Sequence, residues 1–318
     1  MRVAVTGGTG FIGGRLVEKL LAKGHETRIL TRKQGSDDLR LRGARLFQGD
    51  LTSKSSLKDF VAGVDVLYHC AGEISRTELM EDLHINGTAR LVNAASGEIQ
   101  KWVQLSSTGA YGFPRAGMIS EDQTPQPVGR YETSKLASDN LVAAASANGA
   151  FSSVILRPSI VYGAGMPNQS LFAMLRMIER GMFFFIGRPG ASANYIHVEN
   201  VVHALLLCAT HSRASGKTFV LSDYCNIEEF VTLMASALGA PIPRRRIPER
   251  VIRGATVLLG KLPGWPLTPS RVDALTSFVR YSTKRIEDEL DYRHPLSMSE
   301  GVADLVRHYR ESRIERRA

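Results

Sequence analysis

The chain has 318 residues, of which 43% are apolar and 22% charged, and its formal net charge is +9. This composition is typical of a soluble globular protein with enough apolar material for one large domain, or for a medium domain with a smaller cap. No uncharged apolar run approaches the roughly 20 residues that a membrane-spanning helix needs. Aromatic residues are not interleaved with the basic ones, as stacking on nucleic acid requires. We therefore expect neither an integral membrane segment nor nucleic-acid binding.

The three cysteines, Cys70, Cys208 and Cys225, are few, dispersed and odd in number. They match neither a disulfide framework nor a metal site, and they are typical of a reducing compartment. The chain begins with residues that predict a β-strand, so we expect no secretory signal. The sequence therefore predicts a cytoplasmic protein without a bound metal ion.

The first fourteen residues, MRVAVTGGTGFIGG, predict a strand, a tight glycine turn and the start of a helix. Gly7 permits the turn, Gly10 lets the backbone approach a phosphate, and Gly13 lets the helix lie close to the strand. The helix N-terminus offers free N–H groups to an anion. The residues expected to hold a dinucleotide pyrophosphate are Gly7, Gly10, Phe11, Ile12 and Gly13.

Strand-like apolar runs alternate with helical patterns through the first half of the chain. We expect strands at Arg2–Val5, Thr27–Leu30, Arg45–Gln48, Val64–His69, Lys101–Leu105 and Ser153–Leu156. We expect helices at about Phe11–Lys23, Ser55–Val61, Leu79–Ala95 and Tyr131–Asn148. This alternation predicts an α/β fold with a doubly wound parallel sheet of the Rossmann type, covered by helices on both faces.

After about residue 160, frequent prolines break the chain into short elements. A helix at Val198–Ala209 and a strand at Lys217–Leu221 are expected to return to the main sheet. We therefore predict a dinucleotide-binding domain over 1–164, with 196–222 returning to it. Residues 165–195 and 223–318 are expected to form a smaller, mostly helical substrate cap. The ligand should lie where this cap meets the carboxyl ends of the strands.

Tyr131 and Lys135 lie four residues apart at the start of a predicted helix, so both side chains share one helix face. A phenol with a pKa near 10 is a poor base at neutral pH, and a nearby ammonium stabilises its phenolate. Ser107 and Thr108 close the strand before this helix, where a hydroxyl can bond to a substrate oxygen. Of these two hydroxyls we favour Ser107 over Thr108.

Together with these motifs, six segments resemble the extended short-chain dehydrogenase/reductases. That group contains the NAD-dependent epimerase/dehydratases and the 3β-hydroxysteroid dehydrogenase-like enzymes. The resemblance covers nearly the whole chain. Its segments are Gly49–Leu51, His69–Gly72, Asn86–Thr88, Ser106–Gly112, Arg157–Gly163 and Asn194–Val201.

The resemblance implies a role for each matched position. Asp50 with Leu51 would hold the adenine, and the adenosine side would be lined by Cys70, Ala71 and Gly72. Asn86 would keep the active-site helix in place. Pro158 would lie at the nicotinamide carboxamide. In the implied mechanism, hydride passes between nicotinamide and a substrate carbon while Tyr131 acts as general acid or base. Lys135 would lower the pKa of Tyr131 and also bind the cofactor, and Ser107 would orient the substrate oxygen. The resemblance also implies a homodimer through the helix at 129–148, whose apolar stripe includes Leu141 and Val142.

The second predicted strand is followed by Thr31, Arg32 and Lys33. NAD-preferring enzymes usually place an acidic residue there to accept from the ribose hydroxyls, whereas Arg32, with Lys33, could bind a 2′-phosphate. We therefore favour NADP(H), with NAD(H) as the alternative.

Two substrate classes are open, and we favour the first, a nucleotide-diphosphate sugar, over the second. Asn168 stands where such enzymes often contact the sugar diphosphate. Many of them carry Arg-Asp before the Tyr-Ile-His-Val segment, where this chain has Ala193 and Asn194. Arg188, Arg271 or the run Arg244–Arg246 is then the candidate replacement for the missing arginine.

The second class is a larger apolar alcohol or ketone, as in hydroxysteroid dehydrogenases or dihydroflavonol reductases. The segment Val198–His203 is similar to the corresponding sterol-dehydrogenase segment. The apolar stretch Val251–Leu262, with interspersed basic residues, is either a helix packed within the cap, an apolar lid or a contact with a membrane surface. A non-catalytic dinucleotide-binding regulator is a third hypothesis, which the presence of both Tyr131 and Lys135 disfavours.

Overall fold

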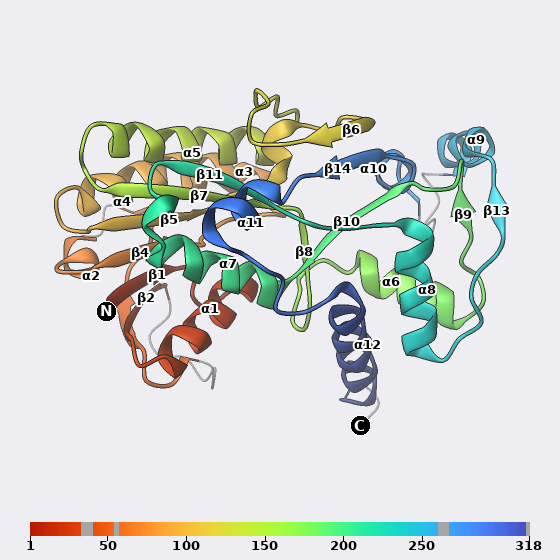
Figure 1. Cartoon of the computed structure of the whole chain (residues 1–318), viewed down its shortest axis with the longest axis horizontal. Helices are drawn as coiled ribbons and strands as arrows, with labels where there is room; N and C mark the ends of the chain where they lie inside the picture. The colour runs from red at the N-terminus through yellow and green to blue at the C-terminus, as the bar shows by residue number, and fades with distance from the viewer. Residues whose placement is uncertain (33–40, 54–56, 260–266, 316–318) are drawn as a thin grey trace.

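The computed structural model describes residues 1–32, 41–53, 57–259 and 267–315 (Figure 1). Its main layer contains the strands β1 (Arg2–Thr6), β2 (Glu26–Thr31), β3 (Arg45–Gln48), β4 (Val66–His69), β5 (Lys101–Leu105), β7 (Ser152–Pro158) and β11 (Lys217–Leu221). They form one sheet in the order β11-β7-β5-β4-β1-β2-β3, with every pair parallel. The strand order reverses between β1 and β4, and a ligand crevice forms at the carboxyl ends of strands on either side of such a reversal.

Helices cover both faces of this sheet (Figure 1). One face carries α1 (Phe11–Ala22), α7 (Val198–Thr210) and α11 (Lys284–Leu290), and the other carries α2 (Lys58–Val61), α4 (Thr88–Ala95) and α5 (Arg130–Ala147). Val3 and Val5 of β1 belong to the core on the first face, whereas Ala4 belongs to the core on the second. Burial on both faces explains why these strands are continuously apolar. The predicted doubly wound fold is confirmed.

The helix expected over Leu79–Ala95 consists of three segments, α3 (Thr77–Glu81), a π-helical turn (Asp82–Gly87) and α4. Insertion of a π-helical turn shifts which side chains face the sheet and α5. The strand expected from Val64 begins at Val66, because the N–H of Val64 is bonded to the carbonyl of Val61 in a turn. The first residues of the helix expected at Ser55–Val61 lie outside the described residues.

The second lobe has its own apolar core. Its elements are β8 (Ile160–Tyr162), α6 (Ser170–Glu179), β9 (Phe185–Ile186), β10 (Ser192–His197), β12 (Asp223–Asn226), α8 (Ile227–Leu238), β13 (Arg246–Ile247), α9 (Glu249–Leu259), α10 (Pro269–Leu275), β14 (Phe278–Tyr281) and α12 (Met298–Glu315). The core lies mainly between α6, α8 and α12, with Phe172, Leu175, Phe230 and Leu305 among its members. A capping box between Asn226 and Glu229 fixes the start of α8.

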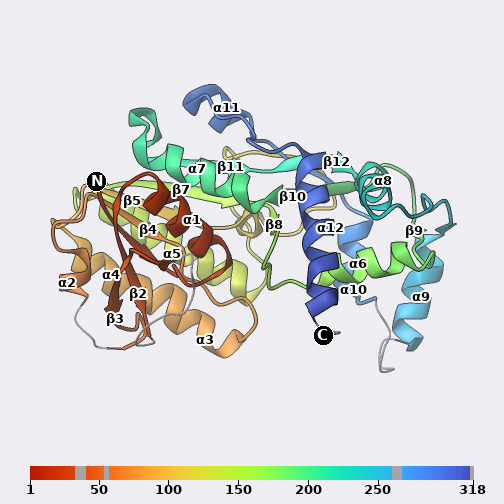
Figure 2. The same cartoon turned by 90° about the horizontal axis from the view of Figure 1, so that it is seen from below.

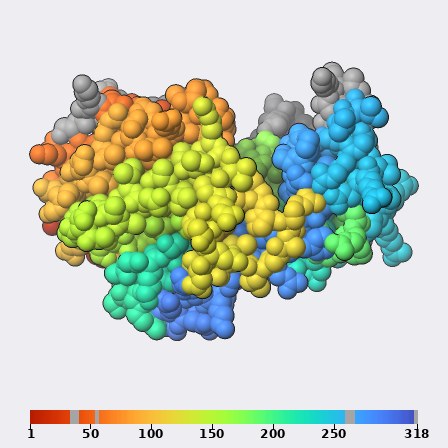
Figure 3. All heavy atoms as spheres, turned by 90° about the horizontal axis from the view of Figure 1, so that it is seen from above, coloured from red at the N-terminus to blue at the C-terminus, as the bar shows by residue number. Residues whose placement is uncertain are grey.

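One small sheet, of β8, β10 and β12, lies within the second lobe. Another joins the lobes, because β14 pairs with β6 (Ala116–Ile119), which belongs to the first half of the chain. The expected cap range 223–318 includes α11, but Ile286 and Leu290 of α11 pack into the core beside the main sheet. Figure 2 shows α9 at the far end of the second lobe, and in Figure 3 the surface is hollowed between the two lobes.

No helix in the described part of the chain is both long and apolar enough to cross a membrane. On α5, Val142 is buried in the chain's own core, so it is not available to a partner subunit, while Leu141 is half-buried.

Candidate active site

The glycine-rich turn between β1 and α1 packs so closely against the surrounding backbone that its glycines have no room for a side chain. Gly7 has a φ of +70°, and a Cβ there would lie 2.7 Å from the backbone nitrogen of Ala71. A Cβ on Gly13 would lie 2.2 Å from the carbonyl oxygen of Gly7, and one on Gly10 would lie 3.2 Å from the same atom. This close-packed turn fits a dinucleotide pyrophosphate, which the backbone N–H groups of the turn and of the first turn of α1 would hold.

The other residues expected at the cofactor lie around the same end of the sheet. Phe11 and Ile12 form the first turn of α1, Arg32 is exposed after β2, Asp50 and Leu51 follow β3, Cys70–Gly72 follow β4, and Pro158 ends β7. The Asp50 carboxylate accepts hydrogen bonds from the N–H and the hydroxyl of Thr52, both at 2.9 Å. Lys33 lies outside the described residues.

Tyr131, Ser107 and Lys135 meet where β5 ends and α5 begins. Ser107 hydrogen-bonds the Tyr131 hydroxyl and also accepts from the N–H of Gly109 at 3.1 Å. The buried Lys135 ammonium donates to the carbonyl of Leu105 at 2.6 Å. Thr108 is buried and is bonded to Tyr281 instead, so Ser107 is the hydroxyl that faces Tyr131.

The pKa of Tyr131 departs from the expectation that Lys135 lowers it. Burial, with the charge of Glu132, raises the Tyr131 pKa to about 12, and the hydrogen bond from Ser107 opposes this only in part. Burial also lowers the pKa of Lys135. Its ammonium donates to the Leu105 carbonyl and interacts with the nearby Asp139 carboxylate. Tyr131 therefore carries its proton at neutral pH.

A buried ion pair that was not among the residues predicted from the sequence lies near Lys135. Arg157 on β7 donates to Asp139 on α5 from Nε at 3.2 Å and from a terminal nitrogen at 3.1 Å, and Ser106 donates to the same carboxylate at 2.7 Å. Asp139 is 1% exposed and Arg157 6% exposed. Two signals were present: Asp139 follows Lys135 at helical spacing, and Arg157 interrupts an apolar strand, where a buried charge needs a partner.

The role expected of Asn86 falls to a different residue. Asn86 is exposed and donates to Asp82 at 3.2 Å, away from α5. His84 is buried instead; its Nδ1 lies 2.7 Å from the Ser134 hydroxyl of α5, and its Nε2 accepts from the N–H of Glu73 at 2.9 Å. The buried positions recur at 80, 84, 88, 91 and 95, and that spacing in the sequence would have favoured His84.

A chain of buried polar groups links the cofactor turn to α5. Thr6 of β1 contacts His69 at 2.6 Å, His69 contacts Thr88 at 3.0 Å, and Thr88 contacts Ser138 of α5 at 2.9 Å. Gln104 of β5 donates to Ser138 at 2.9 Å. Burial lowers the pKa of His69 well below its usual range, so the ring is neutral and can both donate and accept.

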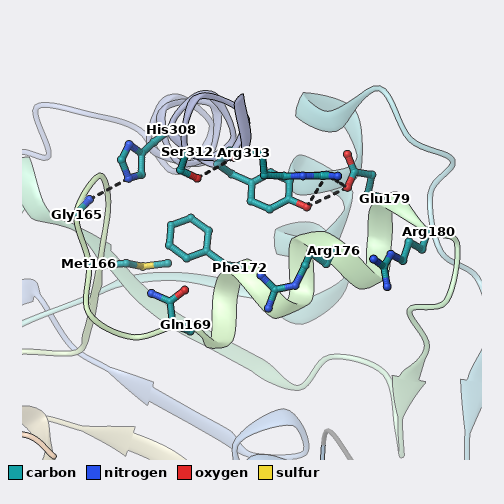
Figure 4. Close-up of a pocket in the computed structure, with 11 residues that line it drawn as sticks. Gly165, Met166, Gln169, Phe172, Arg176, Glu179, Arg180, His308, Ser312 and Arg313 are labelled. Atoms are coloured by element: carbon teal, nitrogen blue, oxygen red, sulfur yellow. Dashed lines mark hydrogen bonds and ion pairs between the residues drawn. The ribbon is translucent and has the colours of Figure 1, made fainter. Parts of the chain in front are cut away.

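Asn168, expected at the substrate, lies in the loop before α6, where its side-chain oxygen accepts from the N–H of Ser170 at 2.8 Å. A pocket of about 360 Å³ lies nearby between α6 and α12, lined by Phe172, Arg176, His308 and Tyr309 among others (Figure 4). Tyr131, Lys135 and Ser107 do not line it, so it is separate from the catalytic group. The described residues include no group of three or more His, Cys, Asp or Glu side chains that could hold a metal ion.

Known proteins match this chain over most of its length. The sequence profile of the NAD dependent epimerase/dehydratase family matches residues 3–222. Sterol demethylase protein B of Methylococcus capsulatus is 29% identical, covering 98% of this chain and 99% of that protein. The sterol-4-alpha-carboxylate 3-dehydrogenase, decarboxylating, of Bos taurus is 27% identical, covering 98% and 93%.

Among solved structures, MoeE5 in complex with UDP-glucose and NAD has a TM-score of 0.73 and 25% identity, covering 98% of this chain and 99% of that one. One conclusion follows from the glycine cradle, the arrangement of Tyr131 and Lys135, and the profile match. The chain belongs to the NAD-dependent epimerase/dehydratase family and is a nicotinamide-dinucleotide-dependent enzyme of the extended short-chain dehydrogenase/reductase type.

Proposed function

We propose that this enzyme interconverts a secondary alcohol and a ketone on a large apolar ring substrate of the hydroxysteroid type. The observation that carries this choice is the absence of a positive charge at Ala193 and Asn194 of β10, a strand of the second lobe. A nucleotide-sugar enzyme of this family would be expected to place an arginine at the position of Ala193. Ala193 is 1% exposed within the cap core, and the Asn194 amide donates to the carbonyl of Val279 at 2.8 Å. Neither residue offers a positive charge to a diphosphate.

Two of the candidate replacement arginines are engaged elsewhere. Arg246 is paired with Glu228 and donates to the carbonyl of Gly187. The Arg188 guanidinium lies over the ring of Phe278, 5.2 Å from its centroid. The full-length likeness to two sterol-metabolising proteins supports the same substrate class.

Each catalytic side chain then has one task. When bound, the nicotinamide supplies or accepts the hydride at the substrate carbon. Tyr131, protonated because burial raises its pKa, donates a proton to the ketone oxygen during reduction. Ser107, already bonded to Tyr131, orients that oxygen. Lys135, which donates to the Leu105 carbonyl, is the proposed contact to the cofactor. In alcohol oxidation the Tyr131 phenolate accepts the proton of the substrate hydroxyl.

The cofactor form and the subunit arrangement are further parts of the proposal. Arg32 is exposed after β2, and neither of the described residues there, Thr31 and Arg32, is acidic, which supports NADP(H) over NAD(H). A lower KM for NADH than for NADPH would contradict this. We also propose a homodimer that forms through the outer face of α5. Light scattering of the purified protein tests whether it is a dimer.

A nucleotide-diphosphate sugar is the second candidate, favoured by the likeness to MoeE5, whose solved complex contains UDP-glucose. A thermal-shift screen of the cofactor-loaded protein separates the two candidates. Its ligands are 3β-hydroxysteroids and flavonoids on one side and UDP, dTDP and GDP sugars on the other. A ligand at one hundred times its Kd adds about 2.7 kcal/mol, which raises the Tm by several degrees. A shift only with a nucleotide sugar would overturn the first proposal.

A further inference from the structure

The helix α9 carries an exposed apolar face at the far end of the cap. Val257 and Leu258 are each 80% exposed and Val251 is 58% exposed. Together with Arg250 and Gly254 they occupy positions i, i+1, i+4, i+7 and i+8 of the helix, so they share one face. Isolated exposed apolar residues are ordinary, but three on one face of a short helix mark an interaction surface.

The opposite face holds α9 firmly on the protein. Ile252 and Thr256 are buried, and Ile252 packs with Ile186 and Val272. Arg253 donates to Glu249 at 2.8 Å and to Asp273 at 2.7 Å. The exposed face therefore belongs to a helix fixed in place.

The unpaired charges on this surface are all positive. Residues 250–258 include no carboxylate, and the neighbouring carboxylates, Glu249 and Asp273, are paired with Arg115 and Arg253. Across the described parts of the chain, Arg250 has no ion-pair or hydrogen-bond partner. Arg244 and Arg245 are also exposed on the segment that leads through β13 into α9. The surface combines unpaired cations with apolar side chains.

From this combination we propose that α9 docks the enzyme on an anionic lipid surface. Val251, Val257 and Leu258 enter the boundary between headgroups and acyl chains, and Arg250 contacts lipid phosphates. A second copy of the chain is a poorer occupant, because each copy has a net charge of +9 and presents the same cations. The helix has 11 residues and is about 17 Å long, too short to span the bilayer, so the contact is peripheral.

The position of α9 gives this docking a consequence for substrate entry. Figures 1 and 2 place α9 at the end of the second lobe, and Figure 3 shows that lobe forming one wall of the hollow between the lobes. A protein docked through α9 has its second lobe next to the lipid surface, where apolar ring compounds accumulate. The docking itself rests on α9 and its charges and is independent of the proposed substrate.

Co-sedimentation with vesicles tests the docking on the full chain. The probes are vesicles of phosphatidylcholine alone and of phosphatidylcholine with phosphatidylserine. We expect binding to the anionic vesicles, weak binding to the neutral ones, and weakening by salt. The double variant V257E/L258E should lower the affinity at least tenfold, and Arg250→Glu should lower it by a smaller factor.

The control is Ile314→Glu, which adds one carboxylate, half the charge of the double variant, at an isoleucine that is 70% exposed on α12. It should bind vesicles as the wild type does, and all variants should keep the wild-type Tm because the altered side chains are exposed. Three results overturn the proposal: no binding by the wild type, equal binding by V257E/L258E, or a concentration-dependent dimer that the double variant abolishes.

Discussion

An alanine at position 13 is expected to disrupt the cofactor cradle while leaving the fold in place. The added Cβ would lie 2.2 Å from the Gly7 carbonyl oxygen, 2.8 Å from its carbonyl carbon and 3.1 Å from the Gly8 Cα. All three are backbone atoms, so no side chain can rotate away. Because ordinary contacts begin near 3.4 Å, the turn and α1 must separate by roughly 1 Å.

The size of the effect follows from that displacement. Overpacking of this kind costs about 1–3 kcal/mol of unfolding free energy. A 1 Å misplacement can cost about a hundredfold in a catalytic rate, and we take the same factor for binding at this turn. We therefore expect the Kd for the dinucleotide to rise about a hundredfold in Gly13→Ala, with a smaller loss of stability.

Isothermal titration calorimetry with NAD(H) and NADP(H) measures the affinity, and urea unfolding measures the stability. Gly254→Ala is the matched control, because it is also a helical glycine but an added Cβ there meets nothing within 4 Å. That variant should bind cofactor normally and be about 1 kcal/mol more stable. If Gly13→Ala binds the dinucleotide within about threefold of the wild type, the assignment of the cradle is refuted.

Four further results are expected. Tyr131→Phe should bind cofactor with unchanged affinity in calorimetry yet lose at least about a hundredfold in kcat, and near-normal turnover would remove Tyr131 from its role. Glu132→Gln removes a charge that raises the Tyr131 pKa, so the alkaline rise of alcohol oxidation should move to lower pH in a pH–rate profile. Asp139→Asn leaves the buried Arg157 charge unpaired and should cost about 3–5 kcal/mol in urea unfolding. Burial holds the His84 pKa at about 4, below its value in the unfolded chain, so this group makes stability fall as pH drops from about 6.5 towards 4. His84→Gln should therefore reduce the loss of unfolding free energy between pH 7.5 and pH 5 by about 2 kcal/mol, and an identical loss in the variant would contradict the shift.

The parts of the fold that were predicted from the sequence are those with local signals. The glycine turn and the alternation of strands and helices depend on residues within a few positions of one another. The return of α11 to the main sheet has no such signal. The short helix Lys284–Leu290 has an apolar face that could pack against either lobe. Its contacts with β11 show that Ile286 and Leu290 belong to the core of the first lobe.

The error at Asn86 has a different cause. The π-helical turn at Asp82–Gly87 changes the helical register next to the active site. A motif match places Asn86 by its neighbours in sequence, whereas packing selects the side chain that points towards α5, which is that of His84.

The helix α5 explains why buried polar residues at this site resist prediction from hydrophobic pattern. Its buried face consists mainly of Ser134, Lys135, Ser138 and Asp139, with Val142 as an apolar member. Each of these polar groups would cost free energy if unpaired, and each is bonded to the sheet or to a neighbouring helix. Hydrogen bonds depend on direction far more than apolar contacts do. The helix that carries Tyr131 is therefore held at fixed distances from β5 and β7 and, through Ser138, from the cofactor turn. Apolar packing alone would let this helix slide by fractions of an ångström, and proton transfer at Tyr131 requires that it does not.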